Sequence, residues 1–155
     1  MNALLIFGAK YLFVFSILIG LIYFINVPNL LKMRALIFSL FSLALTLLLG
    51  KLASYFFYSP RPFVSEHITP LIQHIADNGF PSDHTLLVSS IATIVTFHNK
   101  EVGFLLWLIA IIVGVSRVYV GVHHVVDIMG SIFIALFATT VVYIVQKKRL
   151  NAIIS

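Results

Sequence analysis

The chain has 155 residues, of which 61% are apolar and only 10% charged, and it contains no cysteine. This length fits a single domain, 1–155, but the composition is far too apolar for a soluble one, and the absence of cysteine excludes disulfides and thiolate metal sites. The net charge of +5 is not gathered into a dense basic face, so we expect a lipid bilayer and not a nucleic acid as the partner. The oligomeric state is left open.

Apolar runs follow one another along the chain and predict an all-α polytopic membrane bundle of about five transmembrane helices. They cover residues 11–27, 35–50 with an extension to 58, 85–97, 102–115 and 125–145. A spanning helix needs roughly 17–25 residues, so the third and fourth runs are long enough only with the polar residues at their ends. Residues 1–10 are apolar but too short to span, and we expect them to form a short interfacial or fraying helix.

The positions of the basic residues predict the orientation of the bundle. Lys32 and Arg34 lie between the first two runs, Lys100 between the third and fourth, and residues 147–149 after the fifth. The positive-inside rule makes this face cytoplasmic. The C-terminus is then cytoplasmic, and the loop 51–80 and the turn 117–124 lie on the outer face. We therefore expect the active site at the extracytoplasmic ends of the helices.

The first polar cluster is Lys51 with Arg61 and Pro62, at the end of the second run. Two prolines, Pro60 and Pro62, favour an extended turn around Arg61. Arginine offers a bidentate fork to phosphate oxygens and lysine a point charge. A membrane-interface lysine and arginine would give the same pattern, so this cluster alone is a weak signal.

The second cluster is the stretch 79–84, Gly-Phe-Pro-Ser-Asp-His, which opens the third run. Ser82 or Asp83 can cap the helix, and the free N–H groups of a helix N-terminus bind anions. His84 lies in the first turn, where it could protonate a departing oxygen. Ordinary helix capping accounts for Ser82 and Asp83 but leaves His84 unexplained.

The third cluster runs from Ser116 and Arg117 to His123 and Asp127. On a helix, His123 and Asp127 would lie four residues apart on one face and within hydrogen-bonding reach. Gly121 would allow a tight turn that brings Arg117 to His123, whereas the adjacent His124 would point elsewhere. Ionisable groups at membrane depth are costly and are usually functional. Together the clusters predict a phosphate pocket, although spacing alone does not decide whether His123 or His84 is the nucleophile.

These motifs resemble those of the type 2 phosphatidic acid phosphatase superfamily, which read Lys-x6-Arg-Pro, Pro-Ser-x-His and Ser-Arg-x5-His-x3-Asp. The second and third occur here at the family's spacing, at 81–84 and 116–127. The stretch from Arg61 to Thr85 is similar to the bacterial undecaprenyl-diphosphatase branch. Ser54 stands where the family has its lysine, and Lys51 is the candidate substitute, one helical turn earlier.

The resemblance implies a two-step mechanism that uses neither a metal nor another cofactor. In that mechanism His123 forms a phosphohistidine and is oriented by Asp127, while His84 protonates the leaving oxygen. The expected phosphate-binding residues are Lys51, Arg61, Ser82, Asp83 and Arg117.

The expected function is hydrolysis of undecaprenyl diphosphate to the monophosphate and phosphate, at the outer face of a bacterial inner membrane. Another phosphorylated lipid, such as phosphatidate, phosphatidylglycerophosphate or lipid A, is the first alternative. A non-catalytic phospholipid binder or transporter is the second, and a purely structural bundle the third.

Overall fold

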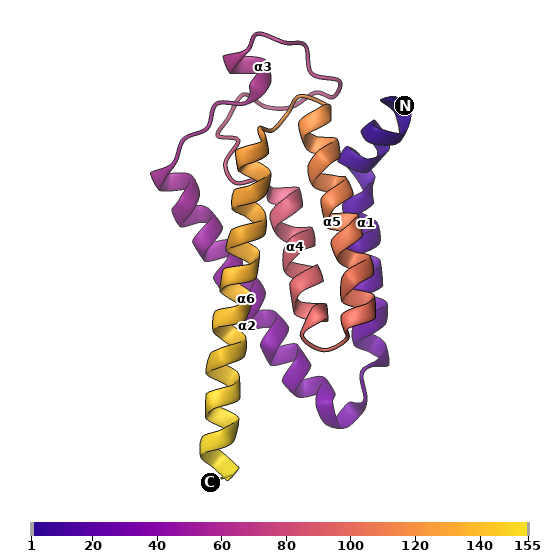
Figure 1. The fold of residues 1–155 in the computed structure, drawn as a ribbon, viewed down its shortest axis with the longest axis vertical. Helices are drawn as coiled ribbons and strands as arrows, with labels where there is room; N and C mark the ends of the chain where they lie inside the picture. The colour runs from indigo at the N-terminus through magenta and orange to yellow at the C-terminus, as the bar shows by residue number, and fades with distance from the viewer. Residues whose placement is uncertain (1, 155) are drawn as a thin grey trace.

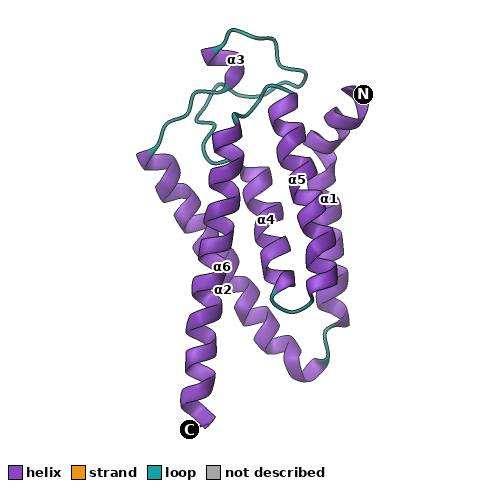
Figure 2. Cartoon of the chain, in the orientation of Figure 1, coloured by secondary structure: helices purple, strands orange, loops and turns teal. Residues whose placement is uncertain are grey.

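The computed structural model describes the backbone of residues 2–154 and the side chains of residues 2–148. Within this range the chain forms six helices: α1 (Asn2–Asn26), α2 (Asn29–Phe56), α3 (Pro62–Ser65), α4 (Asp83–Thr96), α5 (Lys100–Tyr119) and α6 (Val125–Ile154). Figure 2 shows the extended loop between α2 and α4, which carries the short α3, at one end of the bundle. The prediction of an all-helical membrane bundle is therefore confirmed.

Four of these helices are long and apolar enough to cross a membrane: α1, α2, α5 and the Val125–Lys148 part of α6. The third predicted span, α4, has only 14 residues, which corresponds to about 21 Å at 1.5 Å per residue. It packs against α1, α2, α5 and α6, so the longer helices enclose it. Because α4 is shorter than the roughly 30 Å hydrocarbon core, the count of five spans stays a prediction.

Large apolar side chains cover the outer faces of the longer helices. Leu30, Phe104 and Phe133 are 93%, 65% and 69% exposed, and many other leucines, isoleucines and phenylalanines share this position. A contiguous apolar surface of this extent is unfavourable in water. In a bilayer the same side chains contact lipid chains, which agrees with the membrane assignment.

Residues 1–10, expected to form an interfacial or fraying helix, are helical from Asn2 onward but are not separate from the first span. From Asn2 onward, these residues form the first turns of α1, which continues to Asn26 without a break. Gly8 and Lys10 lower the local hydropathy, but neither interrupts the helix. The segment is held by tertiary contacts: Ala9 packs against Val120 and Val122, and the Tyr119 hydroxyl donates to Asn2 at 2.9 Å.

The turns alternate between the two ends of the bundle, so that the N- and C-termini lie at opposite ends (Figure 1). At one end, the α1–α2 turn contains Pro28, and Asn99 begins α5 by accepting hydrogen bonds from the backbone N–H groups of Glu101 and Val102. At the other end lie the long α2–α4 loop and the α5–α6 turn. The two segments are joined by a hydrogen bond from the Leu71 N–H to the Val120 carbonyl. The structure therefore gathers all three sequence clusters at one end.

Candidate active site

The α5–α6 turn places the third cluster around a central histidine. Gly121 has φ +78°, a left-handed conformation that favours glycine. The turn brings the Val122 N–H back to the Arg117 carbonyl at 3.3 Å. His123 follows within this turn, before α6 begins at Val125, so His123 and Asp127 do not share one helix.

The expected contact between His123 and Asp127 nevertheless forms. Asp127 lies in the first turn of α6, is fully buried, and its Oδ2 is 3.4 Å from the His123 Nδ1. The same oxygen accepts a hydrogen bond from the His124 backbone N–H at 2.8 Å. Gly79 lets the α2–α4 loop approach this carboxylate, because an added Cβ there would lie 3.0 Å from Oδ2. The His124 ring points away, toward the Pro60 carbonyl at 3.1 Å.

Arg61 contacts the opposite edge of the His123 ring. Its Nη1 lies 3.2 Å from the His123 Nε2 and donates to the Val122 carbonyl at 2.9 Å. Its Nε forms an ion pair with Asp77 at 2.7 Å. The backbone of Arg61 is extended and Pro62 opens α3, as the two flanking prolines predicted.

Arg117 approaches the same nitrogen from the end of α5. Its Nη2 lies 3.3 Å from the His123 Nε2, and its Nη1 donates to the Ala9 carbonyl at 3.3 Å. The side chain is almost fully buried, yet it is absent from the ion pairs of the described residues. Its Nε has no hydrogen-bond partner among those residues. A buried cation of this kind is costly unless an anion is bound beside it.

These contacts determine which ring nitrogen of His123 carries the proton. Guanidinium groups can only donate, so the Nε2 between Arg61 and Arg117 is the acceptor. The proton therefore lies on Nδ1, which donates to Asp127. Burial lowers the pKa of His123; the Asp127 hydrogen bond opposes this, and the two arginines reinforce it. The result is a neutral imidazole whose Nε2 lone pair faces two cations, an arrangement suited to attack on a bound anion.

The start of α4 lies against the start of α6. The Ser131 hydroxyl donates to the carbonyls of Ser82 and Asp127 at 3.0 and 2.7 Å, and the Ser82 N–H approaches the Asp127 carbonyl at 3.4 Å. Ser82 is the N-cap residue but makes no side-chain cap hydrogen bond. Its buried hydroxyl instead accepts from Thr85 at 3.2 Å.

The remaining two predicted residues of α4 differ in their surroundings. His84 is half-buried in the first turn, with its ring edge-on to Phe13 at 4.8 Å between centroids. Asp83 is exposed and lines a cavity with Lys51 and Arg61. The described contacts include no hydrogen bond from either side chain.

The same cavity, of about 320 Å³, holds the candidate lysine. Lys51 is exposed on its wall, and Ser54, at the position of the family lysine, lines the same cavity but is hydrogen-bonded to the α2–α4 loop. Ser54 accepts hydrogen bonds from the Asn78 side-chain amide through its hydroxyl and carbonyl at 3.1 and 2.9 Å. Asn78 thereby joins the loop to the end of α2, and Lys51 is the lysine that faces the cavity.

Two residues that the sequence analysis did not select belong to this cluster. The Nε2 of His74 lies 3.1 Å from Arg117, and its ring centroid is 6.2 Å from that of His123. Burial and the two nearby arginines lower the pKa of His74. Asp77 pairs with Arg61; burial would raise the pKa of this carboxyl, but the hydrogen bond and charge of Arg61 lower it. Both residues lie in a loop without periodicity, so only the density of polar residues there was a signal.

Comparison with known proteins places the chain in a family. The PAP2 superfamily profile matches residues 35–151, so the chain belongs to the PAP2 superfamily. Undecaprenyl-diphosphatase BcrC of Bacillus subtilis (strain 168) is 38% identical over 90 residues, 58% of this chain and 47% of that protein. The match therefore spans about half of that relative's length. The bacitracin transport permease protein BcrC of Bacillus licheniformis is 29% identical over 150 residues, 96% of this chain and 73% of that protein.

A solved structure shares the fold. The crystal structure of a transmembrane PAP2-type phosphatidylglycerolphosphate phosphatase from Bacillus subtilis matches with a TM-score of 0.65 and 26% identity. The match covers 95% of this chain and 77% of that one. The resemblance seen in the sequence motifs is thus confirmed at the level of the superfamily.

Proposed function

We propose that the protein is a membrane lipid phosphatase that hydrolyses a polyprenyl diphosphate to the monophosphate and phosphate. The observation that carries the proposal is the buried Arg117. Its Nη2 lies beside the His123 Nε2, and its Nε has no hydrogen-bond partner among the described residues. A terminal phosphate bound there would supply the missing anion. The PAP2 superfamily match and the similarity to a relative named undecaprenyl-diphosphatase support this substrate class.

The proposed reaction has two steps. The His123 Nε2 attacks the terminal phosphorus, an N–P bond forms, and the P–O bond to the lipid monophosphate breaks. His84 gives its proton to the departing oxygen. Water then attacks the phosphohistidine, His84 accepts the proton of that water, and the N–P bond breaks to release phosphate. Throughout, Asp127 orients the imidazole through Nδ1.

Positive charge around the phosphoryl group stabilises the transition state in this scheme. Arg61 and Arg117 face the reacting nitrogen at 3.2 and 3.3 Å, so in this scheme both guanidinium groups move from its lone pair to the phosphoryl oxygens when the phosphate binds. The N-terminus of α4 at Ser82 supplies free N–H groups. Lys51, on the cavity wall beside Arg61, is placed for the second phosphate of a diphosphate. Asp83, a carboxylate on the same wall, would act by orienting Lys51 or water.

The test is phosphate release by purified protein in detergent, with a matched pair of histidine variants. His123→Asn should lose nearly all turnover, whereas His67→Asn should retain it because His67 is exposed in the loop. When the terminal phosphate of the substrate is labelled and the protein is quenched at alkaline pH during turnover, the label should be found on the peptide that contains His123. A fully active His123→Asn protein would refute the mechanism.

The same purified protein also tests two alternative functions. The structural likeness to a phosphatidylglycerolphosphate phosphatase favours a glycerophospholipid phosphate as the second candidate substrate, and a panel with phosphatidate and lipid A separates these activities. The relative named as a transport permease raises a non-catalytic binder or transporter. A protein that binds the lipid diphosphate but releases no phosphate from any lipid would support that alternative.

A further inference from the structure

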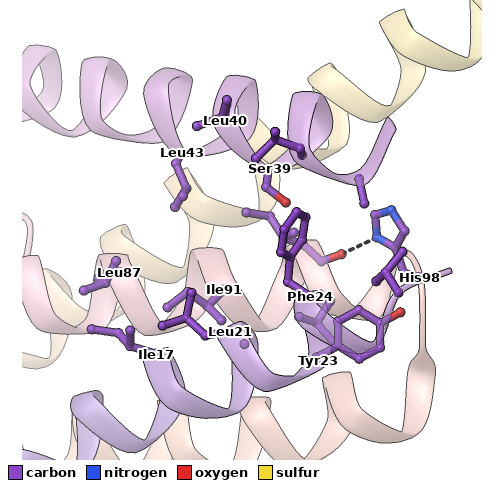
Figure 3. Close-up of a pocket in the computed structure, with 16 residues that line it drawn as sticks. Ile17, Leu21, Tyr23, Phe24, Ser39, Leu40, Leu43, Leu87, Ile91 and His98 are labelled. Carbon is purple, nitrogen blue, oxygen red and sulfur yellow. Dashed lines mark hydrogen bonds between the residues drawn. The ribbon is translucent and has the colours of Figure 1, made fainter. Parts of the chain in front are cut away.

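An apolar groove on one side of the bundle lies between α1, α2 and α4. It has a volume of about 420 Å³ and an almost entirely apolar lining. Figure 3 shows Leu40 and Leu43 of α2 facing Leu87 and Ile91 of α4 across the groove, with Ile17 of α1 along one side. α1 and α2 meet at the Pro28 turn and diverge toward the end of the bundle that carries the active site (Figure 1).

This groove and the polar cavity at Lys51 follow one line along α2. Leu36, Leu40 and Leu43 line the groove, and Leu47 and Lys51 line the cavity. The spacing of three or four residues places these positions on one face of the helix. From Leu36 to Lys51 the face is about 22 Å long.

The opposite wall on α4 follows the same order. Asp83 lines the cavity, and Leu87, Ile91 and Val95 line the groove. Asp83, Leu87, Ile91 and Val95 are each four residues apart, so they also form one stripe. The apolar groove and the polar cavity therefore follow one another along α2 and α4, and in the cavity Arg61 lines the wall and also contacts the His123 Nε2 at 3.2 Å.

We propose that this groove holds the isoprenoid chain of the lipid substrate while its diphosphate occupies the site around Arg61 and His123. The inference rests on the proposed function and specifies where its substrate lies. One end of the path is apolar and the other cationic, which matches the two ends of a polyprenyl diphosphate. Binding transfers the isoprenoid chain from the apolar bilayer to an apolar groove, so its burial contributes little affinity. The groove instead holds the leaving group in line with the attacking nitrogen.

Leu43→Trp tests the groove, with Leu48→Trp as the matched control. Leu43 is the groove-lining residue of α2 that is nearest in sequence to the polar cavity, whereas Leu48 is 54% exposed on the same helix and is outside the residues that line either space. Against undecaprenyl diphosphate, Leu43→Trp should lose about tenfold or more in kcat/KM, because the headgroup is displaced. Against a short-chain isoprenyl diphosphate, both variants should stay within about twofold of wild type. Equal activity of the two variants on the long substrate would overturn the inference.

A second variant and a binding measurement separate the groove from folding and from catalysis. Ser39→Phe should reproduce the effect of Leu43→Trp, because Ser39 faces the same space. In His123→Ala protein, a polyprenyl diphosphate with a diazirine in mid-chain should crosslink to peptides containing residues 36–43 and 87–95. Predominant labelling of the outer face of α6 around Phe133 would overturn the inference and indicate ordinary lipid contact. Absence of turnover by wild-type protein on any lipid diphosphate would instead refute the proposed function, whatever the labelling.

Discussion

Replacement of Arg117 by methionine is expected to remove nearly all activity without lowering stability. The guanidinium is buried and is absent from the ion pairs of the described residues. Its contacts to the Ala9 carbonyl and to His74 contribute about 0.5–1.5 kcal/mol each in net terms. Removing a buried, unpaired charge recovers a desolvation cost of several kcal/mol. The free energy of unfolding should therefore stay near the wild-type value or rise.

The loss of activity follows from the two groups that face the reacting centre. The Nη2 lies beside His123, and the Nε lacks a partner among the described residues. Two charge-assisted hydrogen bonds to a phosphoryl group contribute about 1.5–3 kcal/mol each. Their removal raises the barrier by about 3–6 kcal/mol, or about 10²- to 10⁴-fold in kcat/KM.

Arg61→Met is the comparison that makes this prediction specific. Arg61 is equally buried but is held by Asp77 and the Val122 carbonyl. Its loss should reduce activity and also destabilise the protein by about 1–3 kcal/mol, with the exposed Asp77 contributing little of this. The assays are phosphate release and the thermal unfolding midpoint in one detergent. If Arg117→Met lowers the midpoint as much as Arg61→Met, the reasoning about an unpaired cation is refuted.

Four further predictions concern the same site. Asp127→Asn should lower kcat about 10- to 100-fold, since it removes a charged acceptor from the His123 Nδ1; an unchanged kcat would contradict this role. The lowered pKa of His123, ordinarily 6.5, predicts that the acid limb of kcat/KM has its midpoint below pH 6.5, because protonation of His123 removes the lone pair; an acid limb with its midpoint above pH 6.5 would contradict it. His74→Ala should lower kcat/KM about 3- to 10-fold and His74→Gln should restore part of it, because Arg117 needs an acceptor; no rescue would argue against that contact. Reporters fused after Arg149 and inserted in the α1–α2 turn at Pro28, next to Lys32 and Arg34 at the start of α2, should both give cytoplasmic signals, and an external signal from either would invert the predicted topology.

Local spacing predicted the contacts around His123. Arg117, Gly121 and His123 are close in sequence, so one tight turn is enough to bring the arginine to the histidine. Asp127 reaches His123 although the histidine precedes α6, because the carboxylate also binds the His124 N–H. The order of the helices likewise followed from apolar runs. Contacts that depend on a few neighbouring residues could thus be predicted.

Contacts between distant segments could not be predicted in this way. His74 reaches Arg117 because the Leu71 N–H binds the Val120 carbonyl, a long-range contact with no periodic signal. Residues 2–10 become helical through packing on the α5–α6 turn, as Ala9 does against Val120. Hydropathy considers each segment without its tertiary contacts. Because Gly8 and Lys10 lower the local hydropathy, the sequence did not indicate that α1 begins before residue 11.

The central claim is that this chain releases phosphate from a membrane lipid diphosphate without a metal. The most direct measurement is phosphate release from undecaprenyl diphosphate by purified protein in detergent, with a metal chelator present. We predict turnover under these conditions that His123→Asn abolishes. Activity that returns only when a divalent metal is added would contradict the phosphohistidine mechanism. Absence of phosphate release from this lipid and from phosphatidate, phosphatidylglycerophosphate and lipid A would contradict the assignment as a lipid phosphatase.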